Sequence, residues 1–218
     1  MKTLSLVLLA AIILLCSSHS HAAGLGIYGT FGGGTADWTV DNTSSLDFSK
    51  RTNHFGAGLA LDTAPARDRL FNYQLNLGYD RFRNSNGKAW GNAEFEGFVI
   101  SNCFGFGGLI NDRTRLWFGP EIRLEWANGH PDNFPSYKIR LFGFGIGPVV
   151  GVNFNIGESQ TFAVKAGYQF INYAGVGHGM YSHTGNATPT YSNSYDYDVS
   201  EQMAYVTLQY FFRTSGDR

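Results

Sequence analysis

The sequence predicts an all-β fold: an eight-stranded, antiparallel, up-and-down β-barrel that crosses a membrane. Three features of the 218 residues support this prediction. Apolar and polar residues alternate through segments of about 9–11 residues, which is the length of a tilted strand that spans a bilayer. An export signal precedes these segments, and the connections between them are short at one end and mostly long at the other.

Residues 1–22 are predicted to be a cleaved signal peptide. Lys2 supplies the positive charge, residues 4–15 are almost entirely apolar, and residues 20–22 place small side chains at a cleavage site. The apolar run is too short for a membrane-spanning helix. Lipidation at Cys16 is the less favoured alternative, because a leucine precedes this cysteine where lipoprotein signals usually have a small residue.

Composition excludes several other classes of protein. Removing residues 1–22 takes one lysine from the 16 basic residues and leaves all 17 acidic ones, so the mature charge is about −2 and no basic patch indicates nucleic-acid binding. Only Cys103 then remains, which excludes an intrachain disulfide and a cysteine-rich metal site. The 28 glycines and 16% aromatic residues suit the crowded wall and the interfacial girdles of a membrane barrel.

Each predicted strand ends at a turn or loop signal. The expected strands are 24–34, 53–62, 70–82, 93–106, 113–126, 137–154, 160–172 and 199–212. The expected short turns are 63–69, 107–112 and 155–159, and the mostly longer polar loops are 35–52, 83–92, 127–136 and 173–198. An even number of strands places both termini at the end with the short turns, which is the periplasmic side of such a barrel.

The two faces of each strand follow from alternation. In the strand at 113–126, Phe118, Leu124 and Trp126 share the face expected to contact lipid. The opposite face is expected to form a polar network in the lumen. Its proposed members on this and other strands are Asp80, Arg115, Glu121, Arg123, Glu125 and Lys165. Since eight strands leave only enough space for side chains and buried charges need partners, we expect a sealed, ion-paired lumen. A narrow gated pore is the alternative.

Two strands place charges on the apolar face. Glu94 and Glu96 share a face with Phe98, and Lys138 and Arg140 share one with Phe142. Either a bulge reverses the facing or, as we prefer, these charges lie outside at headgroup level. Lys138 and Arg140 would then contact the phosphates of anionic lipids. Pro120 and Pro148 each remove a ladder hydrogen bond and are expected to mark bulges.

The final strand, Tyr205-Val206-Thr207-Leu208-Gln209-Tyr210-Phe211-Phe212, follows the same alternation and ends in aromatic residues. With the signal peptide and loop pattern, it resembles the small eight-stranded outer-membrane barrels of the OmpA and OmpX type over residues 23–212. The resemblance implies a bacterial outer-membrane location, contact with lipid and lipopolysaccharide, and recognition of the last strand by the barrel assembly machinery. Such chains usually end on the aromatic residue, whereas this one has a polar tail at 213–218. A soluble, lipocalin-like barrel is the alternative fold.

The last long loop is the candidate for binding an extracellular ligand. It is rich in tyrosine, which supplies contact area with few rotatable bonds, and in small polar residues that form adaptable hydrogen bonds. The candidate contact residues are Tyr173, His178, Tyr181, His183, Tyr191, Tyr195 and Tyr197. The sequence therefore favours a structural role in the envelope or a surface interaction, with adhesion through residues 173–198 as one form of the latter.

A lipid A-modifying enzyme is a further alternative. The residues considered for a catalytic triad are His178, Ser182 and His183, with Asp196, Asp198 or Glu201 as the acid. Lipid A deacylases carry a histidine and a serine two positions apart on a strand, before an asparagine, and the corresponding residues 170–174 contain neither histidine nor serine. We therefore expect no enzymatic activity. No cofactor or metal is expected either, because His130, Asp132 and the loop histidines lack the spacing of metal ligands.

Overall fold

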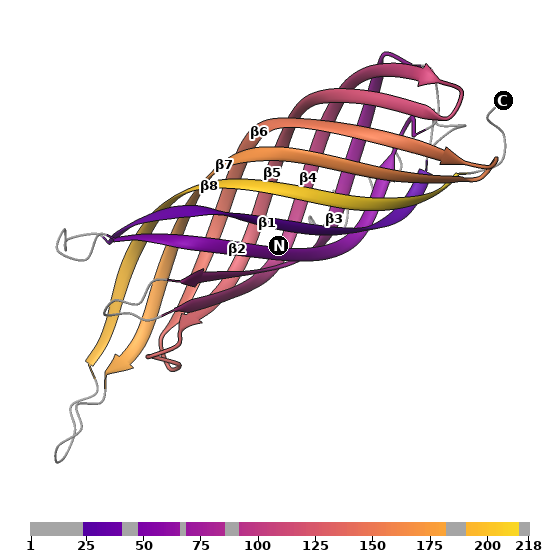
Figure 1. Ribbon diagram of the computed structural model, residues 1–218. Coiled ribbons are helices and arrows are strands. Elements are labelled where there is room, and N and C mark those ends of the chain that lie inside the picture. Colours follow the sequence, from indigo (N-terminus) through magenta and orange to yellow (C-terminus); the bar gives the residue numbers. More distant parts are fainter. Residues whose placement is uncertain (1–23, 41–47, 66–68, 86–91, 182–190, 214–218) are drawn as a thin grey trace, which may run out of the picture.

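The computed structural model describes residues 24–40, 48–65, 69–85, 92–181 and 191–213, which form strands joined by turns (Figure 1). The strands are β1 (Gly24–Val40), β2 (Phe48–Asp62), β3 (Phe71–Ser85), β4 (Ala93–Asn111), β5 (Thr114–Pro131), β6 (Lys138–Ile156), β7 (Gln160–Tyr181) and β8 (Tyr191–Arg213). Among these residues no helix has the length and hydropathy needed to cross a membrane. The predicted signal peptide and residues 214–218 of the predicted tail lie outside the described residues.

Each strand pairs antiparallel with the next, and β8 pairs with β1, so the sheet closes into a barrel. The predicted fold class is therefore confirmed. The connections at 63–70, 112–113 and 157–159 lie at one end, here called the turn end, and the opposite end is called the loop end. Gly24 lies opposite Arg213 in the register, so the first and last described residues lie together at the turn end.

Most strands extend further toward the loop end than the sequence predicts. The largest difference is in β7 and β8, which remain paired out to Tyr181 and Tyr191. The predicted loop 173–198 is therefore mostly a β-hairpin that projects beyond the other strands (Figure 1). Apart from Val176, its described outward residues are small or polar, which gives the pattern of a loop, but the pairing of β7 with β8 supplies backbone partners whatever the outward side chains are.

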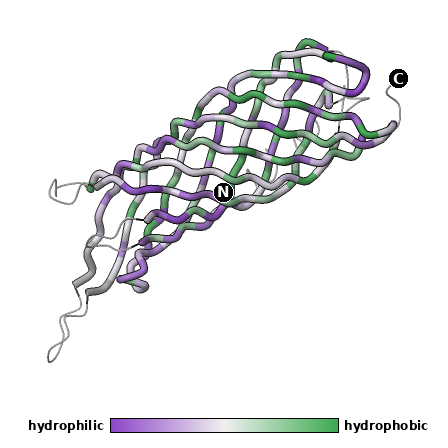
Figure 2. The backbone as a smooth tube through the Cα atoms, viewed as in Figure 1, coloured by the Kyte–Doolittle hydropathy of each residue, from purple (hydrophilic) through white to green (hydrophobic). Residues whose placement is uncertain are grey.

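Alternation along the strands places charged and polar side chains inside and apolar side chains outside. On β8, Val206, Leu208 and Phe212 are exposed, whereas Thr207 and Gln209 between them are buried. The same pattern holds around the barrel (Figure 2), where apolar and polar residues alternate through the body and the strand ends at the lower left are mainly hydrophilic. This arrangement is the reverse of a soluble barrel, whose apolar face would be buried.

The outward charges on β4 and β6 do not arise from bulges. The pairing of β3 with β4 is continuous from Glu94 to Cys103, so Glu94 and Glu96 lie on the outer face above Phe98. Lys138 and Arg140 are likewise exposed on the outer face of β6. The preferred interpretation, with these charges outside the barrel, is the one that the register supports.

The expectation that Pro120 and Pro148 mark bulges is wrong. The two prolines lie opposite each other on β5 and β6. Pro120 interrupts the pairing of β5 with β4, and Pro148 interrupts the pairing of β6 with β7. In both cases the register is the same on either side of the gap. The missing N–H groups interrupt the pairing without adding a residue. The strands instead approach closely: a Cβ atom on Gly147 would lie 1.7 Å from the carbonyl oxygen of Tyr168.

The interior near the loop end contains a column of aromatic rings, which the sequence analysis did not predict. His54 stacks on Phe82 with ring centroids 4.8 Å apart, and Phe82 stacks on Phe95 at 4.9 Å. Trp38 lies 5.6 Å from Phe95 and 5.8 Å from Tyr197, which extends this column of rings toward the loop end. The barrel therefore has a packed aromatic core above its polar lumen.

Candidate functional site

The most concentrated group of charges is a buried cluster in the lumen, formed by His54 on β2, Asp80 on β3, Arg123 and Glu125 on β5, and Glu201 on β8. Each residue occupies an inward position of its strand, so alternation alone directs all five side chains to the barrel axis. Each is at most 5% exposed. The cluster therefore contains three carboxyl groups, one guanidinium and one imidazole, and it lies directly below the aromatic core.

Arg123 bridges two of the acids. Its guanidinium forms an ion pair with Asp80 and contacts the Oε2 atom of Glu125 through Nε and Nη2, each at 3.0 Å. Since both carboxylates are buried, removing this cation would leave uncompensated negative charge in a region of low dielectric.

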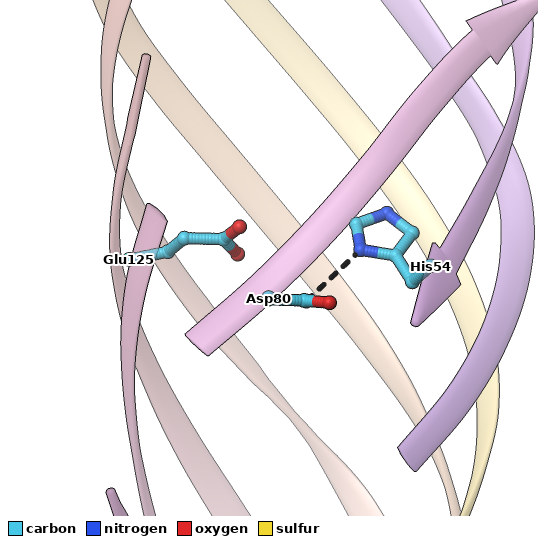
Figure 3. Close-up of side chains that lie close together, drawn as sticks. All are labelled: His54, Asp80 and Glu125. Atoms are coloured by element: carbon cyan, nitrogen blue, oxygen red, sulfur yellow. Dashed lines mark hydrogen bonds and ion pairs between the residues drawn. The ribbon is translucent and has the colours of Figure 1, made fainter. Parts of the chain in front are cut away.

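His54 joins the other two acids. Its Nδ1 lies 3.2 Å from Asp80 Oδ2, and its Nε2 lies 2.8 Å from Glu201 Oε1. Ionised carboxylates only accept hydrogen bonds, and only the cationic imidazole ring donates from both nitrogens, so this geometry favours a charged His54. Figure 3 shows His54 and Asp80 joined in this way, with the carboxylate of Glu125 directed toward them from the facing wall.

Tyr173 completes the cluster. Its hydroxyl lies 3.2 Å from Oε2 of Glu125 and 3.2 Å from Oε2 of Glu201, so it can donate to either carboxylate. The expectation that Tyr173 belongs to a surface loop is wrong, because this residue is 3% exposed and lies on the inner face of β7. The strand continues past the predicted boundary at 172 and places Tyr173 in the lumen.

A second polar layer lies nearer the turn end. Lys165 forms an ion pair with Glu121, whose Oε1 accepts a hydrogen bond from the Tyr205 hydroxyl at 2.9 Å. A third layer is centred on Asp62, which accepts hydrogen bonds from the Ala64 amide at 2.8 Å and the Gln74 side chain at 2.7 Å. These layers place polar side chains along the lumen from the buried cluster to the turn end.

All six predicted lumen residues are buried inside the barrel. Arg115 belongs to the turn end, where it donates to the carbonyl of Arg69 at 2.8 Å. Sequence reasoning did not assign His54, Asp62 or Glu201 to the lumen. Alternation could have identified two of them. Glu201 lies on the same face of its strand as the inward Tyr205, and His54 lies on the face opposite to the outward Phe55.

The predicted surface-binding residues are placed in different environments. His178 is exposed on the outer face of β7, whereas Tyr195 packs against the aromatic core. Tyr197 is 3% exposed, so its assignment to a surface loop is wrong for the same reason as that of Tyr173. Tyr181 and Tyr191 pair at the hairpin tip. His183, and Ser182 of the considered triad, lie outside the described residues.

The cluster offers few means for catalysis or metal binding. Ligand atoms of His54, Asp80 and Glu125 lie within 4.8 Å of one another. Both nitrogens of His54 already face carboxylates, and the Arg123 guanidinium contacts both Asp80 and Glu125, so a cation placed there would face a fixed positive charge. Among the described residues, no serine or cysteine forms a hydrogen bond with His54 as an activated nucleophile would.

No family model and no curated protein matches this chain. Solved structures do match it. The outer membrane protein OprG of Pseudomonas aeruginosa is 13% identical, with 90% of this chain and 99% of that chain covered and a TM-score of 0.59. The attachment invasion locus protein Ail of Yersinia pestis is 12% identical, with 90% and 100% covered and a TM-score of 0.38. The similarity to OprG confirms the predicted resemblance to outer-membrane barrels at the level of the fold alone.

Proposed function

We propose that this chain spans the bacterial outer membrane as a sealed barrel, that it serves a structural role in the envelope, and that its loop end faces outward. The observation that carries the proposal is the reversed polarity of the barrel. Large apolar side chains such as Leu59, Phe118 and Leu208 are more than 40% exposed, while charged residues such as Arg115 and Glu125 are fully buried. Such an exterior is stable in lipid and unstable in water.

The height of the apolar band supports this placement. On β8 the outward residues are apolar or aromatic from Ala204 to Phe212, and they are polar from Gln202 to Ser194. A band of about 9–11 residues on a tilted strand matches the hydrocarbon thickness of a bilayer. Lipid, including lipopolysaccharide in the outer leaflet, is the proposed surrounding. The barrel assembly machinery is the proposed partner during insertion, with β8 as the recognised strand.

The filled lumen supports a structural role over a pore. Three polar layers and the aromatic core occupy the interior, and the charges of the buried cluster are paired across four strands. Opening a path for ions would require several of these pairs to separate in a low-dielectric interior. Planar bilayer recordings are therefore expected to remain silent across voltage and salt, and reproducible conductance would favour the pore alternative.

The test of the proposed function is heat modifiability combined with proteolysis. Folded protein in detergent should migrate differently from boiled protein, and protease added to lipid vesicles should cleave only near residues 41–47, 86–91, 132–137 and 182–190. Cleavage at the connections 63–70 or 112–113 instead would reverse the proposed orientation. Solubility without detergent would reject membrane insertion altogether.

A surface interaction is the second candidate, and the β7–β8 hairpin favours it. Paired strands carry its tip beyond the other strands (Figure 1), where His178 and Ser194 are exposed. We propose that an extracellular ligand would contact this tip. Replacing residues 182–190 with an Asn-Gly turn would preserve the pairing of Tyr181 with Tyr191. Loss of cell adhesion with an unchanged heat-modifiability shift is the expected result, and unchanged adhesion would reject this role.

A further inference from the structure

A charged groove lies on the outer face of the barrel near the loop end. It crosses β3 to β6 and is lined by Arg81, Glu94, Glu96, His130, Lys138 and Arg140, together with Asn128. All of these side chains point away from the lumen. The groove is therefore separate from the buried cluster, and any ligand would reach it from the lipid or headgroup side.

The groove lies directly above a row of aromatic side chains. Tyr79, Phe98, Trp126 and Phe142 are opposite one another in the register of β3 to β6. The ring centroids of Trp126 and Phe142 are 5.2 Å apart, and those of Phe98 and Trp126 are 6.5 Å apart. Aromatic girdles mark the membrane–water interface of outer-membrane barrels. The next outward row toward the loop end therefore lies at headgroup height, about 7 Å further along each strand.

The β3–β4 side of the groove holds one cation and two carboxylates. Arg81 forms an ion pair with Glu94, and Glu96 lies opposite Asn128 in the register. Asn128 on β5 therefore stands between Glu96 and Arg140, and the two basic residues of β6 lie on the far side of the groove.

Lys138 and Arg140 form no ion pair or hydrogen bond with any described residue, although both are exposed on the same face of β6. Asn128 lies opposite Arg140 in the register and adds an amide donor. Asp196 and Asp198 line an adjoining depression beyond Arg140 but form no ion pair with it. Two cations without a counter-ion at headgroup height favour an anionic ligand.

We propose that the β5–β6 side of this groove binds the phosphate of a membrane glycolipid, whose acyl chains cover Trp126 and Phe142. The guanidinium of Arg140 would bind phosphate oxygens through two parallel hydrogen bonds, Lys138 would add a point charge, and Asn128 would donate through its amide. A lipid is favoured over free phosphate because the aromatic row lies directly below the cations. This inference rests on the proposed membrane location.

The test uses the refolded barrel in detergent micelles, with purified bisphosphorylated lipid A as the probe and native mass spectrometry as the readout. Charge reversal by Arg140→Glu should weaken binding by roughly tenfold or more, the effect of losing one or two charge-assisted hydrogen bonds. Arg51→Glu is the matched control, because Arg51 is another exposed cation on the outer face but belongs to β2. The affinity of the Arg51→Glu variant for lipid A should remain close to that of the unmodified protein.

Three results would overturn the proposal: unchanged affinity in a folded Lys138→Glu/Arg140→Glu variant, equal binding of dephosphorylated lipid A, or full competition by inorganic phosphate at equal concentration. Folding of each variant is checked by heat modifiability. If a charge-reversal variant does not fold, Lys138→Gln/Arg140→Gln takes its place, with a smaller expected loss of lipid A affinity. A protein that never inserts into micelles would reject the membrane location, whereas a folded barrel that ignores the phosphate would reject only this site.

Discussion

The hydroxyl of Tyr137 lies 2.8 Å from that of Tyr197, and both side chains are buried inside the loop end of the barrel. Tyr137 belongs to the connection between β5 and β6, where its amide donates to the carbonyl of Phe134 at 2.9 Å. This connection therefore folds inward and covers the aromatic core. Gly177 and Gly179 on β7 leave the space that the Tyr137 ring occupies.

The contact predicts that the loop end is closed by Tyr137. Tyr137→Ala should remove a buried ring and lower the free energy of unfolding by about 3 kcal/mol, whereas Tyr137→Phe should cost only about 1 kcal/mol through the lost hydrogen bond. Urea titration in vesicles measures both values. Equal losses for the two variants would show that the ring does not contribute by packing.

The buried cluster predicts a large difference between two arginines. Arg123→Met leaves Asp80 and Glu125 without their shared cation and should lower the free energy of unfolding by about 3–5 kcal/mol. Arg81→Met breaks an ion pair that is largely exposed, so its cost should be about 0–1 kcal/mol. Urea midpoints of the two variants provide the comparison, and similar midpoints would contradict a structural role for the cluster.

The close approach beside Pro148 predicts that Gly147 tolerates no side chain. A Cβ atom there would lie 1.7 Å from a carbonyl oxygen of β7, so Gly147→Ala should force the strands apart and cost roughly 1–3 kcal/mol or more. Gly33→Ala is the control, because its Cβ would have no contact closer than 3.4 Å. If both variants unfold at the same urea concentration as the unmodified protein, the strands are less tightly packed than described.

Alternation was sufficient to predict the fold and the inward facing of Lys165 and Arg123, because facing in a strand depends only on parity. It was not sufficient to identify which charges meet. His54 and Glu201 come from strands that are not paired with each other, and their contact depends on the tilt and stagger of the closed barrel. Tyr197 was assigned to a loop because its outward neighbours are polar, and strands that extend beyond the apolar band lose the apolar face that reveals them in sequence.

The last prediction concerns Lys50, which lies inside the loop-end part of β2, beyond the apolar band. Burial lowers the pKa of its ammonium group to about 8, and its Nζ lies 6.0 Å from the ring centroid of Trp38. The folded protein therefore releases this proton at a lower pH than the unfolded chain, whose lysine pKa is about 10.4. Between these two values the unfolded chain binds more protons, so the contribution of Lys50 to stability rises with pH and is smallest below pH 8.

Replacing this lysine with an apolar residue removes that dependence. Lys50→Met should gain stability over the unmodified protein at pH 7, and the gain should shrink as the pH rises to 10, because the neutral amine no longer carries a buried charge. Urea titrations at pH 7, 8.5 and 10 measure the difference, with Arg51→Met as the control, since Arg51 is the neighbouring cation on the exposed outer face of the same strand. A gain that is constant across this range would show that Lys50 titrates as an ordinary lysine.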